Sequence, residues 1–234
     1  AVPRALRYGP DFAGFTGRSL TPGSLLTEAA TASVATARLV NISTRVALGG
    51  NAGTPIPGFV LGGSGQRTML ARAVGPTLAG FGVANALGDP RLSLVNTGIT
   101  LASNDNWLAS DATLMASAGA FSLLPGSKDA ALAFPLGAGA YTLPVTASDN
   151  GSGVVLLEVY DPSSATGTNL INASTRAYAG TGGSVLIVGF VINGTGSLRC
   201  LIRAVGPTLA GLGVDGTLAD PALDRPGRLG EFLC

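Results

Sequence analysis

LVNISTR, at residues 39–45, returns as LINASTR at residues 170–176, and RAVGPTLAG, at residues 72–80, returns unchanged at residues 203–211. Both repeats have the same offset of 131 residues, and the two copies align without a gap from Leu39 and Leu170 to Leu92 and Leu223. After Asp224 the second copy gives way to the unrelated run RPGRLGEFLC. Self-similarity at a fixed spacing is the mark of a modular array. The sequence therefore predicts one complete structural unit followed by a truncated copy of it.

The chain from residue 39 onward consists of short apolar or alternating runs separated by Gly, Asn, Pro and Ser. Regular short strands with turn signals between them are typical of a β-sandwich or barrel. Gly75-Pro76 predicts one helical turn, because proline favours the first helical position, and residues 110–118 favour a short helix. The expected fold is all-β, an antiparallel, jelly-roll-like β-sandwich repeat. Its strands are expected at residues 39–46, 56–62, 67–74, 91–97, 99–103, 141–147 and 153–160.

This pattern divides the chain into five expected parts. They are an extended N-terminal arm (1–38) without a counterpart in the repeat, a complete β-sandwich repeat (39–161), a linker (162–169), the truncated second repeat (170–223) and a C-terminal tail (224–234). A truncated sandwich leaves strand edges without partners, and such edges accept a strand from another chain. We expect the arm to be the donor of that strand.

The composition favours association and excludes several classes of function. Charged residues make up 12% of the chain and the formal net charge is +1, whereas a typical protein has roughly 25% charged residues. So few charges and so small a net charge promote association between copies. The 14 Lys and Arg residues are scattered along the chain, which argues against nucleic-acid binding. The longest apolar runs fall well short of the about 20 residues that a membrane-spanning helix needs.

Catalytic chemistry has little support in this sequence. The chain has no His, which excludes a Ser-His-Asp or Cys-His arrangement, and its carboxylates form no recognisable acid–base motif. We therefore expect no enzyme. Of the two cysteines, Cys200 aligns with Met69 between apolar neighbours, which predicts a small buried hydrophobic side chain. Whether Cys200 pairs with Cys234 stays open at this point.

The densest polar cluster is Asn104-Asp105-Asn106, followed by Trp107. Three neighbouring side chains with oxygen atoms suit calcium, which takes oxygen ligands. A polar turn whose side chains bind their own backbone is the other interpretation. Trp107 together with Tyr141 and Tyr160 forms a candidate platform for stacking a sugar ring, although a single Trp in a sandwich more often belongs to the core.

Arg72 and Asp89 recur as Arg203 and Asp220, with the same separation in each copy. A charge buried in a chain so poor in charged residues needs a partner, because an isolated buried charge is costly. We therefore expect two structural pairs, Arg72 with Asp89 and Arg203 with Asp220, each fixing a strand end to the turn that follows it.

The motifs as a whole resemble a tandem segment seen in large secreted proteins of environmental bacteria. The resemblance covers residues 39–223 and is carried by LVNISTR at 39–45, GFV at 58–60, RAVGP at 72–76, NDNW at 104–107 and EVYD at 158–161. That family has no established activity. The resemblance implies an extracellular or cell-surface location and a repeated architecture.

Residues 89–161 also resemble the bacterial pre-peptidase C-terminal domain, a small β-sandwich appended to secreted enzymes. The shared pattern includes Asp89, Asn104-Asp105, the run GAYT at 139–142 and the apolar run at 154–160. Relatives of that domain bind calcium or extracellular matrix, which is what this resemblance implies here. The chain departs from the pattern in the long insert 107–128.

Two functional hypotheses follow from these observations. The first is a secreted structural subunit, forming a fibre or surface layer, in which the truncated copy of one subunit accepts the arm of the next; heterologous contacts of this kind give open filaments. The second is a calcium-dependent adhesive or carbohydrate-binding module of a larger extracellular protein, using Asn104, Asp105, Asn106, Trp107 and Tyr141. The expected partners are other copies of the chain in the first case and extracellular polysaccharide or matrix in the second.

Overall fold

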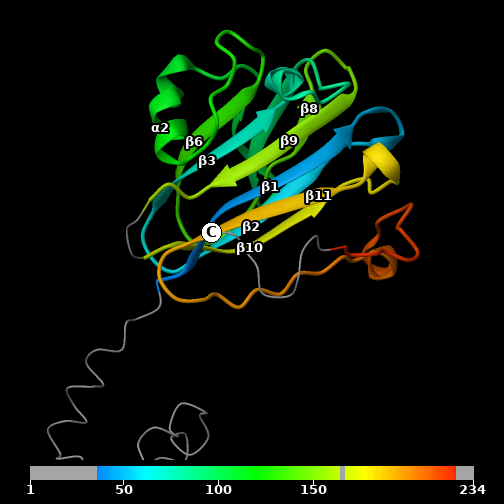
Figure 1. The fold of residues 1–234 in the computed structure, drawn as a ribbon. Coiled ribbons are helices and arrows are strands. Elements are labelled where there is room, and N and C mark those ends of the chain that lie inside the picture. Colours follow the sequence, from blue (N-terminus) through cyan, green and yellow to red (C-terminus); the bar gives the residue numbers. More distant parts are fainter. Residues whose placement is uncertain (1–35, 164–166, 225–234) are drawn as a thin grey trace, which may run out of the picture. The chain divides into compact units, whose positions relative to one another are not determined.

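The computed structural model describes residues 36–163 and 167–224, which belong to one compact unit. The expected arm, apart from residues 36–38, and the expected tail, apart from Asp224, lie outside the described residues. The described chain is almost entirely antiparallel β-sheet, which confirms the expected all-β class (Figure 1).

The strands fall close to the positions that alternation predicts. They are β1 (Arg38–Leu48), β2 (Ile56–Gly62), β3 (Arg67–Val74), β4 (Pro90–Asn96), β5 (Ile99–Asn104), β6 (Ala130–Leu136), β7 (Gly139–Thr142), β8 (Val145–Ala147), β9 (Gly153–Tyr160), β10 (Asn169–Arg176) and β11 (Ile187–Asn193). The helical elements are short: α2 (Ala112–Ser117) and the 3-10 turns η3 (Gly50–Ala52), η4 (Pro76–Phe81), η5 (Ala109–Asp111), η6 (Gly182–Ser184) and η7 (Pro207–Leu212). The expected helical turn and short helix are thus present as η4 and α2.

The strands follow one another in the order β5-β4-β7-β2-β10-β1-β9-β3-β6, with β11 paired to β1 and β8 paired to β4. Inward-facing apolar side chains from nearly every strand form the main core, including Phe59, Leu92, Val155 and Leu157. A second, smaller cluster lies on the other face of β3, β6 and β9, where Leu70 and Val74 pack against Met115 of α2. The segment between β5 and β6 therefore serves as a cover for that face.

The two repeat copies exchange their first two strands. β1 of the first copy pairs with β11 of the second, and β10 of the second copy pairs with β2 of the first. The registers are the same after the 131-residue offset: Ile42 lies opposite Phe190, and Ala173 lies opposite Phe59. The register shift also falls at equivalent positions, between Leu39 and Asn41 in β1 and between Leu170 and Asn172 in β10. The first strand of each copy thus pairs with the second strand of the other copy, in the same register. Reciprocal pairing of this kind means that an approximate two-fold rotation relates the copies, as in an isologous dimer interface.

Equivalent residues of the two copies meet where this two-fold relation requires it. Leu39 bridges to Leu170, and the hydroxyls of Thr44 and Thr175 are 3.0 Å apart, within hydrogen-bond distance. The two copies are therefore joined within one sheet system, and the expected boundary between the repeats at residues 162–169 is not a boundary in space.

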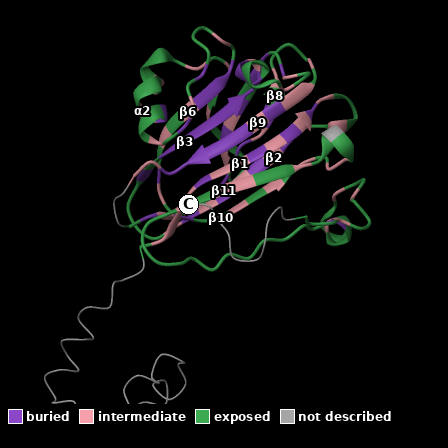
Figure 2. Cartoon of the chain, in the orientation of Figure 1, coloured by how far each residue is buried: buried purple, intermediate pink, exposed green. Residues whose placement is uncertain are grey.

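The second copy lacks the neighbours that bury the first. Its counterpart of β3, residues 198–205, forms no strand (Figure 2). Leu201 is 84% exposed, whereas its counterpart Leu70 is 0% exposed. Val205, Leu218 and Leu223 are likewise large exposed hydrophobic residues, whereas their counterparts in the first copy are buried. The same sequence thus lies in the core in one copy and on the surface in the other.

The turn after this segment nevertheless has the same form in both copies. Gly75 has φ −123° and ψ −78° before η4, and Gly206 has φ −121° and ψ −81° before η7. A Cβ on Gly75 would lie 2.2 Å from the Leu87 carbonyl oxygen, and one on Gly206 would lie 2.1 Å from the Leu218 carbonyl oxygen. The sequence RAVGPTLAG is therefore sufficient to form the turn. The second copy lacks only the neighbouring strands that bury this segment in the first copy.

Candidate functional site

The outer edge of β10 is the clearest candidate site for a partner. Thr175 lies opposite Pro57 of β2, and proline has no N–H with which to exchange hydrogen bonds. The Pro57 carbonyl instead accepts from the Leu143 amide at 2.8 Å, on the β7 side. Directly opposed residues in an antiparallel pair exchange both bonds or neither. The backbone N–H and C=O of Thr175 and of Ala173, two residues earlier, therefore point away from β2 toward the open edge.

In the first copy the corresponding edge is occupied. Thr44, the counterpart of Thr175, lies opposite Leu157 of β9, and Ile42, the counterpart of Ala173, lies opposite Val159. The Val40 carbonyl oxygen accepts from the Asp161 amide at 2.8 Å at the end of the same ladder. β9 is itself paired on its other side with β3. Among the residues that the structure describes, no strand takes the place of β9 beside β10.

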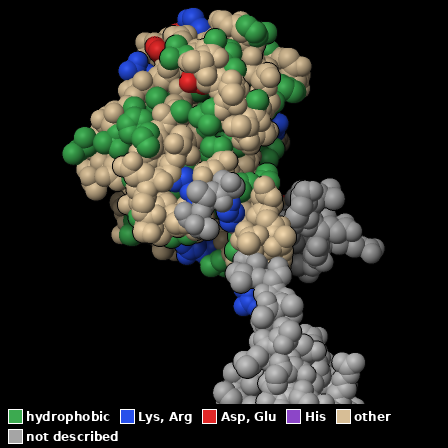
Figure 3. All heavy atoms as spheres, turned by 90° about the vertical axis from the view of Figure 1, so that its left-hand side faces the viewer, with side chains coloured by type: hydrophobic (Ala, Val, Ile, Leu, Met, Phe, Trp, Pro, Cys, Tyr) green, Lys and Arg blue, Asp and Glu red, His purple; other side chains and the backbone are tan. Residues whose placement is uncertain are grey.

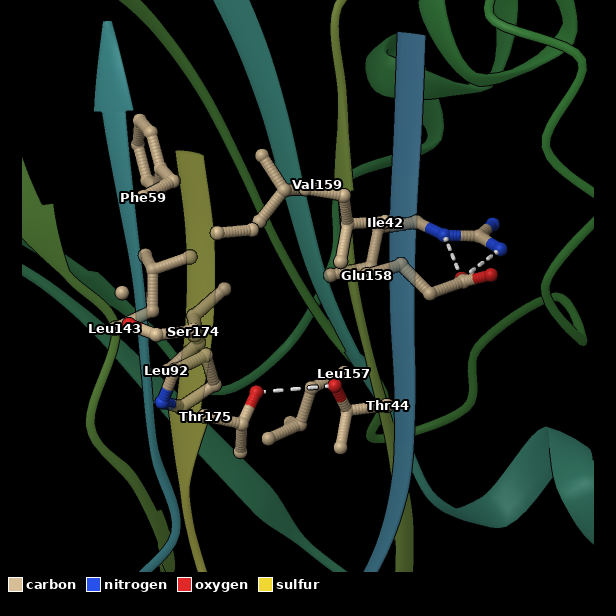
Figure 4. Close-up of a pocket in the computed structure, with 14 residues that line it drawn as sticks. Ile42, Thr44, Phe59, Leu92, Leu143, Leu157, Glu158, Val159, Ser174 and Thr175 are labelled. Atoms are coloured by element: carbon tan, nitrogen blue, oxygen red, sulfur yellow. Dashed lines mark hydrogen bonds and ion pairs between the residues drawn. The ribbon is translucent and has the colours of Figure 1, made fainter. Parts of the chain in front are cut away.

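A buried arginine holds β9 in place in the first copy. Arg72 of β3 lies directly opposite Glu158 of β9, and its Nε and Nη2 donate to Glu158 Oε2 at 2.9 and 2.5 Å. Its Nη1 donates to the Phe121 carbonyl oxygen at 2.7 Å, and the guanidinium carbon lies 4.5 Å from the centre of the Phe121 ring. Arg72 is 1% exposed and Glu158 is 6% exposed. This pair connects β3, β9 and the cover segment at one buried point, and Figure 4 shows two hydrogen bonds that the Glu158 carboxylate accepts.

The same environment also shifts the pKa of the neighbouring Tyr160 hydroxyl. The Tyr160 hydroxyl donates to Glu158 Oε1 at 2.8 Å. Burial raises the pKa of the Tyr160 hydroxyl above its ordinary value of 10.0, and the neighbouring Glu158 carboxylate raises that pKa further. Tyr160 therefore remains a neutral hydrogen-bond donor throughout the ordinary pH range.

The expected pairing of Arg72 with Asp89 is wrong. Arg72 pairs with Glu158, and Asp89 instead pairs with Lys128, whose Nζ lies 2.6 Å from Asp89 Oδ2. The hydrogen bond with Asp89 raises the pKa of the Lys128 ammonium. In the second copy Arg203 and Asp220 are both exposed, and among the described residues no ion pair joins them. The physical reason is that the sheet places a carboxylate from β9 directly opposite Arg72.

The polar cluster at residues 104–106 is engaged in holding a turn. Asn104 Oδ1 accepts from the Ala131 amide at 3.0 Å, and Asn104 Nδ2 donates to the Asn106 carbonyl oxygen at 2.9 Å. Asn106 Nδ2 donates to Asp105 Oδ1 at 3.3 Å, and Arg91 lies 3.7 Å from Asp105 Oδ2. These contacts match the polar-turn interpretation. Within residues 36–163 and 167–224, no three His, Cys, Asp or Glu side chains are grouped as metal ligands.

Trp107 and Tyr141 do not form a common surface. Trp107 packs against the cluster under the cover segment, and its Nε1 donates to Ser127 Oγ at 3.1 Å. Tyr141 is buried in the main core, where its ring stacks on Phe59 with centroids 5.4 Å apart. The structure therefore separates Trp107 from Tyr141, and Tyr160, the third ring of the expected sugar platform, is buried in the second cluster.

Sequence reasoning missed the buried carboxylate of Asp129, which fixes the start of η4. Asp129 Oδ1 accepts from the Gly75 amide at 2.7 Å, and Oδ2 accepts from the hydroxyl of Thr77 and, at 2.5 Å, from that of Ser127. The Asp129 carbonyl oxygen also accepts from the Trp107 amide at 2.7 Å. Asp129 is 0% exposed. Its role is structural, since the contacts with Gly75 and Thr77 tie the cover segment to the Gly-Pro turn and those with Ser127 and Trp107 hold the cover segment itself together.

Two hollows between the described strands have volumes of only about 20 Å³ and 10 Å³. A cavity of about 20 Å³ between β1, β9, β2 and β10 is lined by Ile42, Thr44, Phe59, Glu158 and Thr175 (Figure 4). This is room for about one water molecule, and the Thr44–Thr175 contact crosses it. The cavity is therefore a packing gap at the interface of the two copies rather than a ligand site.

The prediction of a buried Cys200 is wrong. Its counterpart Met69 is 2% exposed, but Cys200 is exposed and has no disulfide partner among the described residues. Residues 198–205 have no strand beside them to cover the thiol. Cys234 lies outside the described residues.

Charged side chains are sparse on the face that carries α2, where hydrophobic side chains gather in several places (Figure 3). No helix in the described part of the chain is both long and apolar enough to cross a membrane.

The fold and the open edge define an all-β repeat protein with an incompletely covered second copy. No protein-family model, curated protein or solved structure matches the chain.

Proposed function

We propose that this protein is an extracellular structural subunit that assembles with other copies of itself by β-strand complementation. In this proposal a second copy of the chain supplies the strand that takes the place of β9 beside β10. The single observation that carries the proposal is the open edge of β10, whose counterpart in β1 is fully paired with β9. The extracellular location rests on the resemblance of the motifs to segments of secreted bacterial proteins.

The exposed apolar surface of the second copy supplies the driving force. Leu201, Val205, Leu218 and Leu223 are 84%, 42%, 46% and 59% exposed, and their four counterparts are almost completely buried. Burying the exposed fractions of these side chains, which together amount to about 2.3 full side chains, is worth about 4–7 kcal/mol at about 1.5–3 kcal/mol for each fully buried side chain. A gain of this size offsets much of the entropic cost of association.

The way in which the two copies are joined within the chain supports the same mode of contact between chains. Both copies bind each other through exchanged strands with identical registers, so strand pairing is already how this repeat contacts its neighbour. A donor and an acceptor at different places on the subunit give a heterologous contact, which extends into a filament unless the rotation closes a ring. The low charge of the chain offers little repulsion against such growth.

Residues 1–35 of the neighbouring copy are the proposed donor. They have no counterpart in the repeat, and β1 begins only at Arg38, whose Nη1 lies 2.6 Å from Asp161 Oδ2. A deletion that tests the donor must therefore stop at residue 35, so that Arg38 and its ion pair are kept.

Sedimentation velocity over a range of concentrations tests the proposal on four proteins: the full chain, a chain lacking residues 1–35, and full chains with Ala173→Pro or Ala173→Val. Proline at 173 removes an N–H from the open edge and none from the β2 ladder, whereas valine keeps that N–H. We expect concentration-dependent assembly of the full chain and of the Ala173→Val variant, and monomers from the other two. A full chain that stays monomeric at every concentration, or assembly that survives both changes, would contradict the proposal.

Asp105→Ala separates this function from a calcium-dependent binding module. Asp105 lies in the turn after β5 and has no contact with β10 in the described structure. A structural subunit should assemble as before, with or without calcium. A binding module should lose calcium affinity, measured by isothermal titration calorimetry, and show no dependence on Ala173.

A further inference from the structure

We infer that the second copy selects the strand it accepts by charge: Arg203 binds a carboxylate on that strand, as Arg72 binds Glu158. This inference rests on the proposed function in taking the edge of β10 as an acceptor for a strand from a second copy. It adds the chemistry of recognition: the strand that residues 1–35 of a second copy supply is apolar on one face and brings a carboxylate to Arg203, and Asp11 and Glu28 are the carboxylates in that segment.

The sequences around Arg72 and Arg203 are identical, so both arginines can be expected to bind in the same way. Arg203 lies in a run of nine residues that is identical to the run around Arg72, and the turn that follows has the same backbone geometry in both. In the first copy the strand between β1 and β3 places Glu158 opposite Arg72. A strand that pairs with β10 as β9 pairs with β1, and that has residues 198–205 on its other side as β9 has β3, brings its corresponding residue to Arg203.

The side chains of β9 define the pattern of apolar and charged residues that the accepted strand needs. Val155, Leu157 and Val159 face the main core, while Glu158 and Tyr160 lie on the opposite face with Arg72. Alternation of this kind follows from the two-residue period of a strand. The accepted strand is therefore apolar on one face, with the carboxylate on the other.

An apolar strand without the carboxylate is selected against. Arg203 is exposed in the absence of a partner, and covering it with a strand that has no acceptor would leave a desolvated charge unpaired. An apolar strand with the carboxylate satisfies the guanidinium through charge-assisted hydrogen bonds, which are among the stronger ones. Because specificity is a difference between two affinities, the unpaired arginine acts as the repulsive element against wrong strands.

The test uses a fluorescein-labelled peptide with the sequence of residues 150–162, NGSGVVLLEVYDP. This peptide stands in for the donated strand, because β9 fills the equivalent place beside β1 in the first copy. Fluorescence anisotropy is measured with the full chain at a concentration where it sediments as a monomer. The protein variants are Arg203→Glu and, as a matched control on the same exposed segment, Arg199→Glu. The peptide variants carry Gln or Arg in place of Glu158, together with a scrambled sequence. Peptide binding does not require that the chain assembles, so this result is separate from the sedimentation test.

We expect the native peptide to bind, Arg203→Glu to weaken binding at least tenfold, and Arg199→Glu to change it less than threefold. The peptide with Arg at the Glu158 position should recover most of the lost affinity with the Arg203→Glu protein. Three results would overturn the inference: no binding of the native peptide, equal binding of the scrambled peptide, or an unchanged affinity in Arg203→Glu. If assembly is seen and the peptide result is negative, the inference fails and the proposed function stands.

Discussion

Replacing Arg72 with Met should be among the most damaging single changes in this protein, while the same change at Arg203 should be nearly silent. The Arg72 side chain is 0% exposed and donates to Glu158 Oε2 and to the Phe121 carbonyl oxygen. Removing it leaves the buried Glu158 carboxylate with only the Tyr160 hydroxyl. Breaking a buried ion pair by deleting one partner costs about 3–5 kcal/mol, a large share of the roughly 5–15 kcal/mol by which a domain is stable.

Urea unfolding followed by Trp107 fluorescence measures both changes. Trp107 is the single tryptophan of the chain and packs in the cluster next to the Arg72 contacts. We expect a loss of about 3–5 kcal/mol in the free energy of unfolding for Arg72→Met and a change within about 0.5 kcal/mol for Arg203→Met. Combining Arg72→Met with Glu158→Leu and Tyr160→Phe should recover most of the loss, because an apolar replacement leaves no unpaired charge. Equal losses at the two arginines would refute the reasoning.

Three further predictions follow from the same core. Above pH 10 the raised pKa of Tyr160 keeps the folded hydroxyl protonated while the unfolded one ionises, so this tyrosine should lower stability by about 1.4 kcal/mol per pH unit. Below pH 10 it contributes no such slope. Urea unfolding of the native chain and of Tyr160→Phe from pH 8 to pH 11 checks this: the variant should have a clearly smaller slope, and equal slopes would contradict the prediction. Asp129→Ala leaves the Gly75 amide and the Thr77 hydroxyl without their acceptor and should cost about 2–4 kcal/mol; no change in the thermal unfolding midpoint would rule this out. Gly75→Ala forces a contact with the Leu87 carbonyl oxygen and should cost more than about 2 kcal/mol. Gly206→Ala forces the same contact with the Leu218 carbonyl oxygen but should shift the unfolding transition reported by Trp107 less, because Leu218 is exposed whereas Leu87 is buried; equal shifts would contradict this.

Alternation of side chains predicted most of the strands because nearly every strand has one face in the core. β6 was missed because its sequence, AALAFPL, alternates weakly and contains Pro135. Within sheets proline is found mainly at edges, at bulges and at the start of strands, and β6 is the last strand in the sheet order. An edge position therefore allows a strand that its own sequence does not reveal.

The partner of Arg72 could not be predicted from spacing along the chain. Asp89 is the near carboxylate in sequence, but Glu158 is 86 residues away and becomes a direct neighbour only when β9 pairs with β3. In the same way, repetition shows that Thr44 and Thr175 are equivalent, but only the folded structure shows that they touch. What the sequence leaves undetermined is the order of strands, because pairing between distant strands depends on the whole core.

The open edge itself provides the most direct test of the account. Hydrogen exchange of the Ala173 and Thr175 amides, resolved by NMR, should be fast in dilute monomer, since both amides face the open edge of β10. When assemblies formed at high concentration are exchanged and then dissociated for measurement, the account predicts strong protection of these two amides, comparable to that of their counterparts Ile42 and Thr44. Assemblies in which Ala173 and Thr175 exchange as fast as in the monomer would contradict strand complementation at this edge.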